Sequence, residues 1–122
     1  MSTDAGVDLV AYSPKLARPV TIQVKTNLRS KPSGGRGKNA LDWWIPEGCP
    51  AALIALVDLS ARRTWLFKAS EIQKVTQQNP RGRYHVCMST DRTYQPKKAR
   101  LAHDYEFQKY LLANRASKLF GV

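Results

Sequence analysis

Gly6-Val7-Asp8-Leu9-Val10 alternates apolar and polar side chains, and so does Val20-Thr21-Ile22-Gln23-Val24-Lys25-Thr26-Asn27. Side chains two residues apart on a strand share a face, so Gln23 and Lys25 lie together, opposite the buried valine and isoleucine row. Asp8 projects toward the same side from its own strand. A short loop with two prolines separates the segments, which predicts an antiparallel pair of strands.

This pattern resembles the PD-(D/E)xK nuclease superfamily. In that family an Asp at the start of one strand is followed, on the next strand, by an acid, an apolar residue and a Lys; here Asp8, Gln23, Val24 and Lys25 match. Gln23 replaces the acid, as it does in some members, including certain homing endonucleases and small resolvase-like proteins. The resemblance implies an α/β fold with a restriction-endonuclease-like mixed β-sheet flanked by helices, formed by residues 1–122 as one domain.

The resemblance also implies a metal-dependent endonuclease that hydrolyses phosphodiester bonds, with DNA as the expected substrate. In such a site Asp8 and Gln23 hold Mg²⁺ (or Mn²⁺), and Lys25 positions or activates the attacking water. The family usually places a helix before the first strand, and few residues precede Asp8 here. We therefore expect that this helix is lacking, and that a second copy or a partner subunit covers the exposed sheet face, unless the C-terminal helix does so.

The charge of the chain favours a polyanionic partner. Twenty Lys and Arg residues stand against nine Asp and Glu residues, a net charge of +11. Nucleic acid is the commonest partner of so basic a surface, although a merely solubilising surface is the alternative. The segment Leu28–Lys38 is rich in glycine and cations, so it predicts a loop without regular structure. Its position after Lys25 favours phosphate contact over a solvated linker, through Arg29, Lys31, Arg36 and Lys38.

Further elements follow from periodicity and turn signals. The continuous apolar run Ala51–Leu59 predicts a central strand covered on both faces. A capping box at Ser70 to Gln73 predicts a helix from Ser70 to about Gln78. The remaining expected elements are strands Val7–Tyr12, Val20–Thr26, Thr64–Lys68 and Tyr84–Met88, and an amphipathic helix over Lys97–Phe120.

Aromatic and cysteine residues give weaker indications. One of Trp43 and Trp44 is expected to pack in the core and the other to be partly exposed, with packing favoured over base stacking. Cys49 and Cys87 show no zinc-ligand spacing, which predicts thiols in a reducing cytoplasm. The longest apolar run is too short to span a bilayer.

Three hypotheses remain from different classes. The first is the metal-dependent endonuclease. The second is a nuclease-fold module that binds nucleic acid but is catalytically impaired. Gln23 adds no charge, so a single carboxylate would bind Mg²⁺ weakly. The third is a basic interaction protein of mixed α/β fold. Agreement between charge, motif and strand order favours the first.

Overall fold

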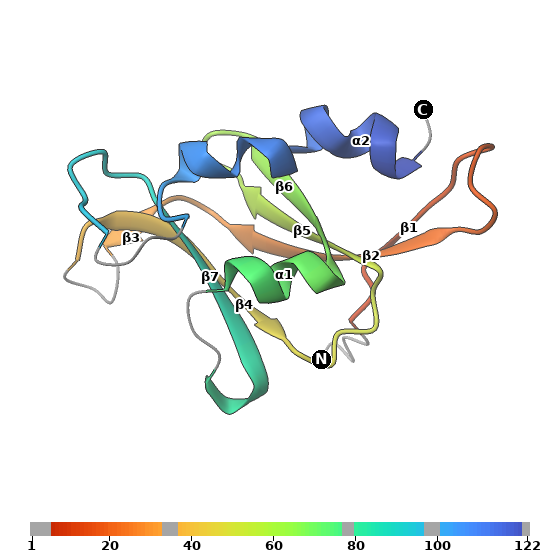
Figure 1. Ribbon diagram of the computed structural model, residues 1–122, viewed down its shortest axis with the longest axis horizontal. Coiled ribbons are helices and arrows are strands. Elements are labelled where there is room, and N and C mark those ends of the chain that lie inside the picture. Colours follow the sequence, from red (N-terminus) through yellow and green to blue (C-terminus); the bar gives the residue numbers. More distant parts are fainter. Residues whose placement is uncertain (1–5, 33–36, 77–79, 97–100, 121–122) are drawn as a thin grey trace.

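The computed structural model describes residues 6–32, 37–76, 80–96 and 101–120, which form a mixed α/β fold (Figure 1). The strands are β1 (Leu9–Ala11), β2 (Val20–Asn27), β3 (Lys31–Pro32), β4 (Asn39–Pro46), β5 (Leu53–Asp58), β6 (Arg63–Lys68) and β7 (Arg83–Ser89). The helices are α1 (Ala69–Val75), α2 (Leu112–Phe120) and the 3-10 helices η2 (Pro80–Gly82) and η3 (Asp104–Tyr110).

The strands of the described residues form two sheets, where the sequence predicted one. The first has the order β1-β2-β5-β6 and the second the order β3-β4-β7. β1 and β2 are antiparallel, as predicted, and β2 and β5 are parallel. A parallel pair needs a crossover connection, which is usually a helix. Here the connection runs through β3 and β4, whose buried row Leu41, Trp43 and Ile45 belongs to the main core.

The central strand β5 is covered on both faces, which confirms its prediction. Ile54 and Leu56 belong to the main core, together with residues of the second sheet, α1 and η3. Leu53 and Ala55 belong to a second cluster, which Leu119 and Phe120 of α2 join. The C-terminal helix α2 therefore packs on this sheet face. This was the alternative to its being covered by a second subunit.

The two predicted helices differ from the observed ones in their boundaries. α1 begins at Ala69, directly after β6, and the Glu71 carboxylate accepts the backbone N–H of Lys68 at 2.7 Å. The predicted capping box at Ser70 is therefore wrong, because the N-cap residue is Lys68, two residues earlier, and the Glu71 side chain reaches back to it.

The single helix predicted over Lys97–Phe120 is also wrong. Residues 97–100 lie outside the described part, and His103 forms a parallel bridge with Ser89. η3 and α2 follow, and Leu111 between them bridges to Trp65. At His103 and Leu111 the backbone pairs with β7 and β6, and this pairing interrupts the helix that the apolar pattern predicted.

None of the helices in the described ranges has the length and apolar character needed to cross a membrane.

Candidate nucleic-acid interface

Asp8 and Gln23 lie on one face of the β1–β2 pair. Leu9 pairs with Ile22, and the Asp8 N–H donates to the Ile22 carbonyl at 2.8 Å, so Asp8 stands opposite Gln23. Lys25 follows two residues later and has the same side-chain direction. The backbone thus places all three residues on one face of the strand pair. Among the described residues, no hydrogen bond or ion pair joins Lys25 to either of the others.

Each of the two oxygen-bearing side chains already has a partner. The Asp8 carboxylate accepts the Val24 N–H at 2.8 Å, where β2 extends beyond the start of β1. Gln23 is 2% exposed, and its Oε1 accepts the Cys49 thiol at 2.7 Å. That thiol also lies 3.6 Å from the Gly6 carbonyl. Both side chains therefore tie together the turn before β1, strand β2 and the loop after β4.

As they stand, these atoms offer a divalent metal one open protein ligand, the Asp8 carboxylate. Mg²⁺ prefers six oxygen ligands in octahedral geometry, several of them carboxylates or waters. Asp8 supplies one exposed carboxylate, while the Gln23 oxygen is closed off from solvent by its thiol donor. The described residues contain no group of three or more His, Cys, Asp or Glu side chains able to hold a metal ion. The Mg²⁺ site implied by the resemblance stays a prediction.

The basic segment after β2 has more structure than predicted. Lys31 and Pro32 form β3 and pair with Ala40 and Asn39 of β4. Proline is tolerated there because β3 is an edge strand, where the missing N–H leaves no ladder bond unmade. Three of the four predicted phosphate contacts are exposed, and the fourth lies outside the described residues. The exposed ones are Arg29, Lys31 and Lys38, and the other is Arg36.

The loop after β7 lies beside the hairpin that β3 and β4 form. The Thr90 N–H donates to the Asn39 carbonyl at 3.0 Å. Asp91 accepts hydrogen bonds from the Thr93 hydroxyl and N–H, and these bonds, with smaller contributions from Lys38 and His103, hold the pKa of its carboxyl below the ordinary value. Asp91 therefore remains charged and offsets part of the positive field of the hairpin.

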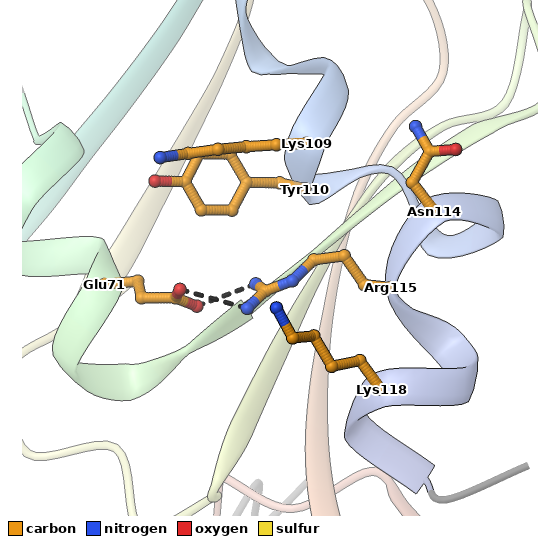
Figure 2. A pocket seen from close by; sticks show the side chains of 6 residues that line it. All are labelled: Glu71, Lys109, Tyr110, Asn114, Arg115 and Lys118. Carbon is orange, nitrogen blue, oxygen red and sulfur yellow. Dashed lines mark hydrogen bonds and ion pairs between the residues drawn. The ribbon is translucent and has the colours of Figure 1, made fainter.

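A second basic region is a depression of about 470 Å³ between α1, η3 and α2 (Figure 2). Arg115 donates to both carboxylate oxygens of Glu71, at 2.7 and 3.0 Å, and to the Leu66 carbonyl at 2.7 Å. Burial alone would raise the pKa of Glu71, but the hydrogen bonds from Arg115 and from the Lys68 N–H outweigh it, and the pKa is lowered.

Figure 2 shows the other cations of the depression around this ion pair. Lys109 lies 5.1 Å from the centre of the Tyr110 ring, and Lys118 extends from the next turn of α2 toward Arg115. Neither lysine forms an ion pair within the described residues. Sequence analysis missed this site, because Glu71 and Arg115 are far apart in the chain and only the docking of α2 brings them together.

The two tryptophans of β4 separate as predicted. Trp43 is 3% exposed and packs edge-on against Trp65 at 5.8 Å. Trp44 is half-buried, with the His85 ring 4.1 Å away in a stacked geometry and the Arg83 guanidinium 4.5 Å from its ring centre. The close stacking on His85 and the partial burial of the ring favour packing over base stacking for Trp44.

His85 contacts a carboxylate on the outer face of the second sheet. Its Nε2 lies 3.0 Å from Asp42 Oδ2. This contact holds the Asp42 carboxylate on the second sheet, whereas Asp8 lies beside the first.

Comparison of the chain with protein-family models, with curated proteins and with solved structures finds no match, so the geometry above is what supports a function.

Proposed function

We propose that this protein binds nucleic acid through the phosphate backbone, with Arg29, Lys31 and Lys38 at the β3–β4 hairpin as principal contacts. The observation that carries the proposal is a net charge of +11 combined with exposed cations on a strand-paired hairpin. Lys and Arg side chains bind phosphates and release condensed counterions, so such a surface gains affinity for any nucleic acid.

The experiment compares two double variants that lose the same charge. Lys31→Ala with Lys38→Ala removes cations from the hairpin, whereas Lys15→Ala with Arg18→Ala removes exposed cations from the β1–β2 loop, at the opposite end of the long axis (Figure 1). The hairpin variant is expected to weaken binding for all sequences alike. It should also flatten the slope of log K against log salt by about 2, because each lost phosphate contact contributes roughly one unit. Equal effects of both variants, or no binding by the wild type, would refute the proposal.

A second candidate is phosphodiester hydrolysis, for which the specific support is the common face of Asp8, Gln23 and Lys25. Asp8→Asn is the appropriate variant, because the amide oxygen can still accept the Val24 N–H while the charge is lost. If the site is active, nucleic acid is cleaved with Mg²⁺ or Mn²⁺, and Asp8→Asn and Lys25→Ala abolish cleavage without weakening binding in EDTA. If no form of DNA or RNA is cleaved, nucleic-acid binding remains as the only proposed function.

Gln23→Glu tests the metal directly. The new carboxylate would be 2% exposed next to a thiol, so it should destabilise the fold without metal. A site that takes Mg²⁺ would recover that stability on metal addition, which thermal unfolding measures. An unchanged melting temperature with metal would count against the metal site.

A further inference from the structure

Three aromatic rings cluster beside the start of η3. His103 stacks on Tyr105, with ring centres 5.1 Å apart and planes 21° apart, and the edge of Tyr94 packs against His103 at 5.9 Å. His103 is 7% exposed, and its Nδ1 lies 3.3 Å from a Glu106 carboxylate oxygen. Its Nε2 is buried without a hydrogen-bond partner among the described residues, so packing and Glu106 hold the ring. Tyr105 therefore rests on a fixed support.

The strand register places this cluster next to the basic hairpin. Lys31 pairs with Ala40, Ala40 pairs with Ser89, and Ser89 bridges to His103. Three successive strand spacings put the His103 backbone about 15 Å from that of Lys31. An extended nucleic-acid strand of a few nucleotides covers that distance.

Tyr105 keeps a large exposed surface on this cluster. It is 47% exposed, whereas Trp44 is half-buried and stacks closely on His85, with ring centres 4.1 Å apart. The Arg92 guanidinium lies 5.7 Å from the Tyr105 ring centre. An exposed cation–π contact is weaker than base–aromatic stacking, so the guanidinium can yield its place to a base and contact a phosphate instead.

We propose that Tyr105 is a stacking platform for an unpaired base, which makes single-stranded nucleic acid the preferred ligand class. This inference rests on the proposed binding function and specifies its substrate. An aromatic ring with cations beside it binds bases of any sequence, because every base presents a π-face. Duplex bases are stacked on one another and cannot reach the ring, so the duplex would bind only through the hairpin cations.

The test measures the fluorescence anisotropy of a labelled oligonucleotide about 16 nucleotides long, as a single strand and as a duplex. Wild type is expected to bind the single strand more tightly. Tyr105→Ala should weaken single-strand binding roughly 5- to 100-fold, and it should leave duplex binding and the salt slope unchanged. Tyr105→Phe keeps the ring and should bind like wild type. Tyr12→Ala removes a tyrosine that is 79% exposed in the β1–β2 loop and should have no effect.

Tyr105→Leu is the control for folding, because leucine still packs on His103 but has no π-face. This variant should stay folded and lose single-strand binding as the alanine variant does. If both oligonucleotides bind but Tyr105→Leu or Tyr105→Ala changes them equally or not at all, the inference is overturned while the binding function stands. If wild type binds neither oligonucleotide, the proposed function fails, and this inference with it.

Discussion

Gly6→Ala is expected to be strongly destabilising, because Gly6 combines two constraints. Its φ is +83°, in the left-handed region that side chains rarely adopt, and a Cβ built on it would lie 2.5 Å from Pro50 Cδ. A proline ring cannot rotate away from this contact. The left-handed backbone costs alanine about 1–2 kcal/mol. Forced overpacking adds about 1–3 kcal/mol.

Together these terms predict a loss of roughly 2–5 kcal/mol in the free energy of unfolding. For a chain of 122 residues, one kcal/mol corresponds to about 4 °C in melting temperature, so the expected decrease is roughly 8–20 °C. Circular dichroism during heating measures it. The matched control is Gly48→Ala, where no atom lies within 4 Å of the built Cβ and φ is ordinary; it should change stability by less than about 1 kcal/mol.

Pro50→Ala separates the two constraints in a double-mutant cycle. It removes the ring atoms that the new Cβ meets, so the Gly6→Ala and Pro50→Ala effects should be non-additive by about 1 kcal/mol or more, in the direction of rescue. Equal melting temperatures for Gly6→Ala and Gly48→Ala would refute this account of the turn that sets the position of Asp8.

The remaining predictions concern the packing of the sheets and α2. Glu71→Gln should cost about 1–3 kcal/mol by weakening the bidentate pair with Arg115, as thermal unfolding measures. Because the folded-state pKa of Glu71 is lowered, this contribution to stability is present above the ordinary pKa of 4.5 and is lost as pH falls through the folded-state pKa. The difference in melting temperature between Glu71→Gln and wild type should therefore become smaller in acid, and a constant difference would contradict the prediction. Asp58→Ala should cost about 1–3 kcal/mol in urea unfolding, because Asp58 is 2% exposed and pairs with Arg63 at 3.1 Å, while Arg63 keeps Asp104 as a second partner at 2.7 Å; no measurable loss would show the Asp58 pair to be unimportant. Wild type should be a monomer in light scattering, because α2 covers the second cluster, while Leu119→Asp should associate; a wild-type dimer would restore the expectation of a partner.

The sequence by itself determined where most strands lie. The alternation over Val20–Thr26 and the unbroken apolar run Ala51–Leu59 predicted β2 and β5, although Gln23 on the polar face of β2 is itself buried. Strand parity alone placed Gln23 and Lys25 on one face, whereas Asp8 joins them only because β1 pairs with β2 in the register that sets Leu9 opposite Ile22.

Only the tertiary structure decided which partners these elements take. The Gln23 oxygen is bound by the thiol of Cys49, and His103 lies in a strand-like bridge where a helical pattern was predicted. Local periodicity carries no information about either contact, because both join residues far apart in the chain. The division into two sheets has the same cause: the alternation of β4 specifies a buried row, but not which strand it pairs with. The alignment of the basic hairpin with the Tyr105 cluster arises from that pairing, which is why the sequence showed the cations but not the rings beside them.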